Sequence, residues 1–170
     1  TCQQCAAGTF APDYGIITCG ACGNNTFSSE DRTSCQTCPM NTEAPPASPN
    51  VTSCICRAGF TTHANYTVNA GLPCQQCAVG TFKTHAGNHP CDRCPSGTTA
   101  PSQHNVSCFQ CTEAHYARPD QSACVPCPLA SWSGNLSSDV SNCTCNAGYT
   151  GPNGQACSAC DAGFYKLTRG

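Results

Sequence analysis

Cysteine is the residue type in this chain with the most chemistry to offer. Twenty of the 170 residues are cysteine, and they fall into eight CxxC pairs and two CxC pairs. The stretch from Cys35 to Cys77 contains both kinds of pair, separated by loops rich in Pro, Asn and Thr. Paired thiols can form disulfides, bind a metal ion or exchange electrons with a substrate. These three chemistries therefore have to be weighed against each other first.

Zinc is the main rival to disulfide bonding, because structural zinc sites also use repeated CxxC pairs. Zinc ribbons are intracellular and do not carry a surplus of glycosylation sequons, so we favour disulfides. A CxxC oxidoreductase needs one activated thiolate at the start of a helix, whereas this chain has eight equivalent pairs. We therefore predict no metal and no cofactor.

No other residues form a recognisable catalytic set. His85 and His89 lie four residues apart, but Gly87 and Pro90 indicate a loop and not a helix. His63, His104 and His115 lack partners at a spacing typical of ligands or of acid–base catalysis. Paired carboxylates, a nucleophile elbow and a phosphate-binding loop are all missing from the sequence. The sequence predicts that the chain is not an enzyme.

The composition favours a disulfide scaffold in an oxidising compartment. Cysteine exceeds the roughly 10% that marks such scaffolds in secreted chains, while large aliphatic residues are few. Only 9% of residues are charged and the net charge is −2, so we expect no nucleic-acid partner. No apolar run is long enough to cross a bilayer, and direct membrane insertion of this segment is not expected. We predict an extracellular, secreted or cell-surface location.

Two disulfide connectivities are compatible with the spacing. In a ladder, the second cysteine of each pair bonds to the first cysteine of the next pair. In an interlocked arrangement, successive pairs bond first to first and second to second, which uses all twenty cysteines. We prefer the ladder, because it gives each loop its own closure. It uses Cys5, Cys19, Cys22, Cys35, Cys38, Cys54, Cys56, Cys74, Cys77, Cys91, Cys94, Cys108, Cys111, Cys124, Cys127, Cys143, Cys145 and Cys157, and it leaves Cys2 and Cys160 unpaired or linked outward.

Potential N-glycosylation sites are more frequent than chance predicts. Six N-x-S/T sequons occur, at Asn24, Asn50, Asn65, Asn105, Asn135 and Asn142. The alternative is coincidence in a chain rich in Ser and Thr, and Asn142 is the weakest member because Cys143 occupies its middle position. N-linked glycans on these loops would supply the solubility that the low charge does not.

The cysteine pairs repeat with a long period. Eight cysteines, from Cys2 to Cys56, recur 89 positions later, and a second register aligns the starts at Cys2, Cys74 and Cys157. We infer a repeat unit over residues 1–72, a second over 73–156 and the start of a third over 157–170.

Aromatic residues and turn residues indicate the local structure. An aromatic follows the second cysteine of most pairs by four or five positions, as at Phe10, Phe82 and Tyr165, which predicts one small core per module. Gly, Pro and Asn interrupt every loop, so we expect short two-stranded hairpins and little other regular structure. The segment from Pro39 to Ser53 is expected to be extended and exposed. The predicted fold is a small disulfide-rich one, an elongated tandem array of cystine-laddered modules.

The order of these signals resembles the cysteine-rich repeats of ephrin-receptor ectodomains, which are related to tumour-necrosis-factor-receptor and EGF-like modules. The similarity is strongest at Cys35 to Cys74 and at Cys124 to Cys157, where a CxC pair is followed by Ala-Gly-Phe60 or Ala-Gly-Tyr149. It implies an extended rod in an extracellular glycoprotein, of the kind that also occurs on the surface of protists. No kinase, separate ligand-binding domain or calcium-binding EGF consensus is present in this segment, so signalling is not part of the expectation.

We therefore expect a structural extracellular glycoprotein, a rod-like repeat segment of a surface filament, a flagellar hair (mastigoneme) or a coat. Its expected partners are copies of itself or other filament proteins. The alternative is the ectodomain of a receptor, adhesin or variant surface antigen that binds a protein ligand. A third possibility is a spacer between domains of a secreted enzyme.

Overall fold

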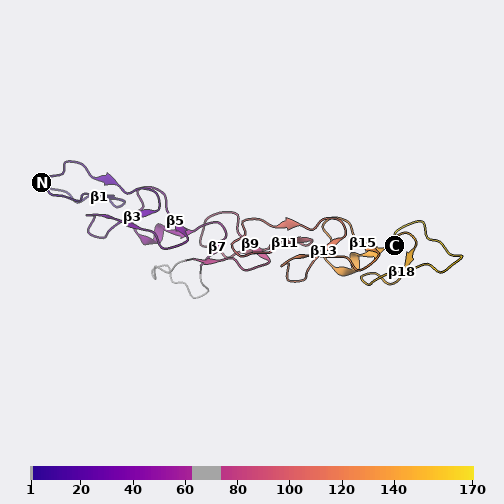
Figure 1. Ribbon diagram of the computed structural model, residues 1–170. Coiled ribbons are helices and arrows are strands. Elements are labelled where there is room, and N and C mark those ends of the chain that lie inside the picture. Colours follow the sequence, from indigo (N-terminus) through magenta and orange to yellow (C-terminus); the bar gives the residue numbers. More distant parts are fainter. Residues whose placement is uncertain (1, 63–73) are drawn as a thin grey trace. The chain divides into compact units, whose positions relative to one another are not determined.

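The computed structural model describes residues 2–62 and 74–170 (Figure 1). The sequon at Asn65 and the histidine at position 63 lie outside the described residues. The chain divides into two compact units, the first comprising Thr1–Gln76 with Thr84–Pro90 and the second comprising Cys77–Lys83 with Cys91–Gly170. These boundaries come from the packing of the chain, and the proposed repeat boundaries at residues 72 and 156 remain a prediction.

Short antiparallel hairpins account for all the strands in the described part of the chain, and each forms its own two-stranded sheet. The first strands are β1 (Thr9–Phe10), β3 (Thr26–Ser28), β5 (Thr42–Glu43), β7 (Phe60–Thr61), β9 (Thr81–Phe82), β11 (Thr98–Thr99), β13 (His115–Ala117), β15 (Ser131–Trp132) and β17 (Tyr149–Thr150). Their partners are β2 (Gly20–Ala21), β4 (Cys35–Thr37), β6 (Ile55–Cys56), β8 (Gln75–Gln76), β10 (Asp92–Arg93), β12 (Phe109–Gln110), β14 (Cys124–Pro126), β16 (Thr144–Cys145) and β18 (Ser158–Ala159). Within each unit the hairpins follow one another in chain order (Figure 1).

Each hairpin is closed by one disulfide, which joins the second cysteine of a pair to the first cysteine of the next. The bonds are Cys5–Cys19, Cys22–Cys35, Cys38–Cys54, Cys56–Cys74, Cys77–Cys91, Cys94–Cys108, Cys111–Cys124, Cys127–Cys143 and Cys145–Cys157. This is the ladder and not the interlocked arrangement. We call the stretch from a second cysteine to the next first cysteine a module. Cys2 and Cys160 remain as free thiols, the former exposed and the latter half-buried.

A left-handed residue starts each hairpin. The residue three positions after every second cysteine has a φ between 58° and 90°, including the non-glycine residues Asn25, Asn41, Ala114 and Ala130. The next residue is usually Thr or Ser, whose hydroxyl donates a hydrogen bond to the carbonyl of the residue directly after the second cysteine, as Thr81 does to Ala78 at 2.7 Å. The same bond recurs at Thr9, Thr26, Thr42, Thr98 and Ser131, at 2.6 to 2.8 Å. Together these two features reverse the chain after each disulfide.

The buried apolar side chains of the described residues are all cysteine or alanine. Cys56, Cys77 and Cys145 are fully buried, whereas no Leu, Ile, Val or Phe in the described part of the chain is. Most of the expected module aromatics are half-buried, for example Phe82, and Tyr165 is 82% exposed. Disulfides therefore occupy the positions that aliphatic side chains fill in ordinary domains, and the aromatic rings are peripheral.

The segment from Pro39 to Ser53 departs from the expected extended, exposed loop. It contains β5 and a short 3-10 helix, η1 (Val51–Ser53), and Ser48 is only 2% exposed. The Ser48 hydroxyl donates to the Pro45 carbonyl at 2.7 Å, which curls the Pro-rich stretch inward. A second 3-10 helix, η2 (Val140–Asn142), occupies the equivalent place in the Cys127–Cys143 module.

The fold class predicted from the cysteine pattern is confirmed: the chain is a small disulfide-rich array of cystine-laddered modules with short hairpins. Among the residues that the structure describes, none lies in a helix with the length and apolarity needed to span a bilayer.

Candidate functional site: the junctions between modules

Successive modules are joined by a hydrogen bond that recurs along the chain. The main-chain carbonyl of a second cysteine accepts it from the loop of the following module. The backbone donors are Ala47 to Cys22 (2.8 Å), Gly87 to Cys56 (2.8 Å), His104 to Cys77 (3.1 Å), Leu136 to Cys111 (2.9 Å) and Gly170 to Cys145 (3.1 Å). These loop residues have positive φ values, so their N–H groups turn toward the preceding module.

Side chains form the same bond at two junctions. The Arg32 guanidinium donates to the carbonyl of Cys5, and the Gln121 amide donates to the carbonyl of Cys94. Arg32 and Gln121 have positive φ values, as do the donor residues at the other junctions. The acceptor is thus constant, while the donor is either a backbone or a side-chain N–H.

A second set of bonds runs in the opposite direction across the same junctions. The N–H six residues after a second cysteine donates to the carbonyl of the loop tip in the next module. The pairs are Ala11 to Arg32, Ser28 to Ser48, Lys83 to Asn105, Ala100 to Gln121 and Ala117 to Ser137, at 2.8 to 3.1 Å. Each of these junctions is therefore held by donors and acceptors on both sides, in the manner of a short strand pair.

Backbone also approaches backbone closely between modules that are separated by one intervening module. A Cβ atom built on Gly80 would lie 2.2 Å from the carbonyl oxygen of Asp120, and one on Gly97 would lie 2.0 Å from that of Leu136. Gly8 faces the carbonyl of Ala47 in the same way. In each case the carbonyl belongs to the module after the next one, so a side chain at these glycines would displace a module two positions further along the chain.

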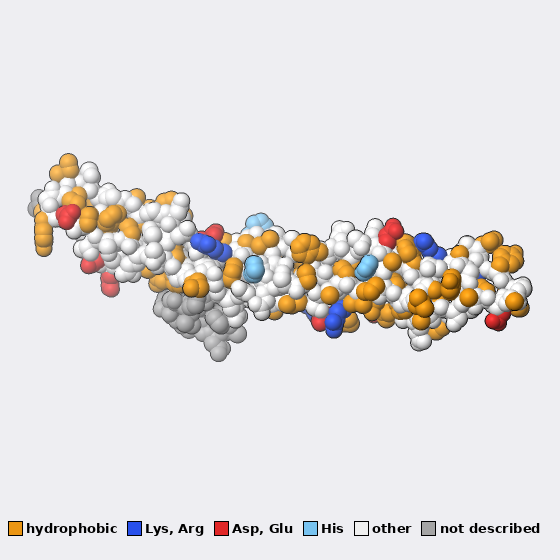
Figure 2. Space-filling model, in the orientation of Figure 1, with side chains coloured by type: hydrophobic (Ala, Val, Ile, Leu, Met, Phe, Trp, Pro, Cys, Tyr) orange, Lys and Arg blue, Asp and Glu red, His pale blue; other side chains and the backbone are white. Residues whose placement is uncertain are grey.

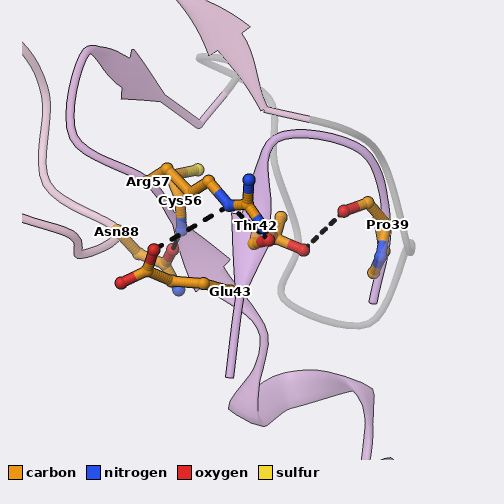
Figure 3. Close-up of polar contacts among 6 residues, drawn as sticks. All are labelled: Pro39, Thr42, Glu43, Cys56, Arg57 and Asn88. Atoms are coloured by element: carbon orange, nitrogen blue, oxygen red, sulfur yellow. Dashed lines mark hydrogen bonds and ion pairs between the residues drawn. The ribbon is translucent and has the colours of Figure 1, made fainter. Parts of the chain in front are cut away.

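Figure 3 shows how polar side chains reinforce one turn in the first unit. The Thr42 hydroxyl donates to the Pro39 carbonyl at 2.6 Å, and the Thr42 carbonyl accepts from Arg57 Nε at 3.1 Å. Arg57 Nε also lies 3.8 Å from Glu43 Oε2, with both side chains about half exposed. Exposed ion pairs of this kind contribute little to stability, so the hydrogen bond to Thr42 is the more important contact.

The neighbouring Cys56 has both of its backbone groups bonded to one loop. Its N–H donates to Asn88 Oδ1 at 3.1 Å (Figure 3), and its carbonyl accepts from the Gly87 N–H at 2.8 Å. Thr61 in β7 adds a bond from its hydroxyl to the His89 carbonyl at 3.2 Å. This loop is the part of the fifth module that packs with the first unit.

Three exposed carboxylates hold the loop tips in shape. The Ser29 hydroxyl, followed by Thr33, lowers the pKa of Asp31, and the hydroxyl and N–H of Ser122 lower the pKa of Asp120. The N–H of Ser141, with its hydroxyl, likewise lowers the pKa of Asp139, which caps η2. Asp31 and Asp120 immediately precede the left-handed residues Arg32 and Gln121, so these are turn-forming carboxylates.

Lys83 is the one charged side chain that is fully buried in the described part of the chain. Burial lowers the pKa of Lys83. Its backbone N–H takes part in the junction with Asn105.

The sequons differ in how their asparagine side chains are placed. Asn24 and Asn135 are exposed. Asn105 is half-buried, and its Nδ2 donates to the Ser102 carbonyl. Asn50 and Asn142 are exposed, but their Oδ1 atoms accept hydrogen bonds at the starts of η1 and η2, from Thr52 and Asp139 respectively.

The histidines are dispersed. His85, His89 and His104 are exposed and His115 is half-buried. Across residues 2–62 and 74–170, no group of three or more His, Cys, Asp or Glu side chains could hold a metal ion. Because eighteen cysteines are in disulfides, those sulfurs are not available as zinc ligands. On the face drawn in Figure 2, Lys and Arg side chains do not gather into a patch.

A family model described as "Tyrosine-protein kinase ephrin type A/B receptor-like" matches residues 65–111. The chain carries an ephrin-receptor-like cysteine-rich repeat. The matched stretch includes the Cys77–Cys91 and Cys94–Cys108 modules, with their paired cysteines and their shared junction. The resemblance inferred from the cysteine pattern is therefore confirmed.

Two mammalian relatives have similar segments. The "Signal peptide, CUB and EGF-like domain-containing protein 2" of Homo sapiens is 36% identical over 93 residues, and that of Mus musculus is 33% identical over 93 residues. Each alignment covers 51% of this chain and 9% of the relative, so the similar segment is a small part of those proteins. Ephrin-receptor-like and EGF-like modules are non-catalytic and are typical of extracellular or cell-surface proteins, which agrees with the predicted location. The protist setting stays a prediction.

The array of modules brings the predicted disulfide residues together but scatters the sequons and histidines. Sequence inspection missed the junction residues, among them Ala47, Gly87 and Leu136. The recurring Thr or Ser after the turn position was a signal that could have been found, since six modules share it. The junction donors have no common side chain, because the backbone does the bonding.

Proposed function

We propose that this chain is a structural segment of an extracellular glycoprotein, a rod-like repeat segment of a surface filament, flagellar hair or coat. The observation that carries the proposal is the recurrent two-way hydrogen bonding between successive modules. Each module is hydrogen-bonded to the next. Tension and bending are therefore transmitted along the chain through backbone hydrogen bonds and disulfides, and no large core is needed. Exposed sequons such as Asn24 and Asn135 supply the glycan coat. The proposed role requires no catalysis.

The proposed polymer would consist of copies of this chain or of related filament proteins. Low charge and a surface without a basic patch on the drawn face suit lateral packing in a glycan-coated fibre (Figure 2). Nucleic acid and membrane insertion have no place in the proposal.

Electron microscopy of the native, unreduced and glycosylated protein tests this function. We expect filaments or sheets in which the chain repeats along an axis, with sugar density at the exposed sequons. Isolated particles of a single chain, with no regular assembly over a range of protein concentration and salt, would overturn the proposal.

The second candidate is the ectodomain of a receptor, adhesin or variant surface antigen. The observation in its favour is the receptor-like family model that matches residues 65–111. Saturable binding of a protein ligand by the isolated, correctly disulfide-bonded chain, together with no assembly in the microscope, would select this candidate.

A further inference from the structure

An open groove of about 440 Å³ lies between the Cys22–Cys35 module and the Cys38–Cys54 module. One side of the groove is the turn formed by Asn24 and Asn25, and the other side comes from β5, β6 and the two prolines that follow β5. Its volume is within the range of small-ligand sites. Asn24 is exposed and is the asparagine of a sequon, so a glycan attached to it would start in the lining of the groove.

Hydrogen bonds hold this turn against the next module. The Asn25 N–H donates to the Ala44 carbonyl at 2.9 Å, and the Cys38 N–H donates to the Asn25 carbonyl at 2.9 Å. Asn25 occupies the left-handed position that is glycine in the first module, where a Cβ built on Gly8 would lie 1.9 Å from a loop carbonyl. Because Asn25 carries a Cβ atom, a loop cannot approach this turn at that distance. The groove is therefore a fixed and open part of the surface.

The opposite side of the groove is apolar, with one carboxylate at its edge. Glu43 in β5 and Ile55 in β6 are cross-strand partners, so their side chains lie on the same face of the hairpin. Pro45 and Pro46 are exposed, and their rigid rings lose no rotamer freedom when a ligand covers them. The Glu43 carboxylate lies 3.8 Å from Arg57 Nε (Figure 3) in an exposed and weak pair, so its oxygens can still accept hydrogen bonds.

We propose that this groove holds the first sugar, an N-acetylglucosamine, of an N-linked glycan on Asn24. The inference rests on the proposed function, in which N-glycans coat the chain. The C–H face of the sugar ring and its acetyl methyl group lie against Pro45, Pro46 and Ile55, and the Glu43 carboxylate accepts a hydrogen bond from the sugar. The sugar contacts both modules and so stabilises their junction, while the rest of the glycan projects into solvent.

The covalent attachment determines which ligand occupies the groove. A sugar on Asn24 is held beside the groove at a high effective concentration, so a weak contact is sufficient. A free ligand would first have to offset the loss of its translational and rotational freedom. The place 89 positions later lacks this combination, because Glu113 replaces Asn24 and Thr144 replaces Ile55. The sequon and the apolar wall thus occur together at only one of the two equivalent places.

Nuclear magnetic resonance of the full, disulfide-bonded chain tests the contact. The isotopically labelled protein is secreted by a host that attaches N-glycans, and an endoglycosidase then trims each glycan to one N-acetylglucosamine. We expect nuclear Overhauser effects between one acetyl methyl group and the protons of Pro45, Pro46 and Ile55. These signals should disappear in Asn24→Gln and persist in the control Asn135→Gln, whose exposed sequon does not line this groove. Absence of these effects, or an Asn24 without glycan in the secreted protein, would overturn the inference.

Thermal melting supplies a second readout with a conservative variant. Ile55→Thr introduces the residue that occupies the equivalent place at Thr144 in β16, so the strand is expected to form. We expect Asn24→Gln to lower the melting temperature more than Asn135→Gln does, and we expect this loss to become smaller in the Ile55→Thr background. The same loss in both backgrounds would contradict a contact between the sugar and the groove.

Other outcomes distinguish this inference from the proposed function. If the Glu43 and Ile55 amide signals shift with protein concentration and not with the presence of the sugar, a second copy of the chain occupies the groove and the inference is wrong. Filaments of protein whose Asn24 sugar makes no contact with the groove would overturn the inference and leave the proposed function standing. A sugar that lies in the groove of a chain that does not assemble would support the inference and contradict the proposed function.

Discussion

The residue three positions after each second cysteine has a left-handed backbone conformation, and this conformation recurs in every module. Glycine occupies it in most modules, but Ala114 and Ala130 adopt it as well, with φ values of 60° and 58°. An L-residue with a side chain is strained in this region by about 1–2 kcal/mol. The disulfide and the junction bonds on either side of the turn offset that cost.

Gly80 and Gly148 allow backbone strain to be distinguished from crowding by another module. Both have a φ of +78°, but a Cβ at Gly80 would lie 2.2 Å from the Asp120 carbonyl oxygen, whereas one at Gly148 meets nothing within 4 Å. We expect Gly148→Ala to lower the free energy of unfolding by about 1 kcal/mol, the cost of the left-handed conformation alone. Gly80→Ala should cost clearly more, because the Cys111–Cys124 module, which contains Asp120, has to move. Thermal melting of both variants with disulfides intact provides the measurement, and equal losses would contradict this close backbone contact.

Glycan occupancy should follow the placement of the asparagine side chains. Asn24 and Asn135 are exposed, whereas the Nδ2 of Asn105 donates to the Ser102 carbonyl. We expect higher occupancy at Asn24 and Asn135 than at Asn105, because a glycan on Nδ2 has to project into solvent. Quantitative glycopeptide mass spectrometry of the secreted protein measures this, and full occupancy of Asn105 beside empty Asn24 would contradict it.

At the scale of the hairpin, the aromatic ring and the disulfide share the stabilisation. Phe82 in β9 is half-buried, while Phe109 in β12 is 57% exposed. Phe82→Ala is expected to lower the free energy of unfolding by about 1–2 kcal/mol through lost apolar burial, and the control Phe109→Ala by well under about 1 kcal/mol. Melting temperature and the rate of proteolysis in the Cys77–Cys91 loop provide the readout. Unchanged values for Phe82→Ala would show that the ring contributes nothing to its module.

The hairpins were predictable from sequence, whereas the junctions between them were not. Cysteine spacing and turn residues were enough to predict the fold class, and the ladder is the connectivity found. The left-handed conformation of Ala47 or Leu136 leaves no mark in the residue type, because neither is a usual residue for positive φ. The bonds they donate come from the backbone, which every non-proline residue possesses. Likewise the burial of Ser48 depends on a hydrogen bond from its hydroxyl to the Pro45 carbonyl, which a Pro-rich composition does not predict.

At the scale of the whole chain, stability depends on covalent cross-links. The buried apolar side chains of the described residues are only Cys and Ala, so the reduced chain has little to bury. Each disulfide that closes a loop of 12 to 18 residues is worth about 3 kcal/mol in the chain-entropy model.

Reduction and chelation should therefore have opposite outcomes. We expect a strong reductant to unfold the protein without any denaturant, whereas a chelator such as EDTA should leave it folded. Hydrodynamic radius and protease sensitivity are the measurements, with the alkylated reduced chain as the unfolded reference. Unfolding by EDTA alone would point to a structural metal ion, and survival of the compact state after complete reduction would contradict the cystine-based core.

Because the junctions are made mainly by backbone groups, the number of modules in the chain can change with less disruption than the length of an ordinary domain. A tandem duplication that inserts one cysteine pair with its loop brings its own N–H and carbonyl groups, and needs no matching side chains in its neighbours. We expect related proteins to differ in the number of modules more readily than in the spacing within one, with side chains on the outer loops free to diverge.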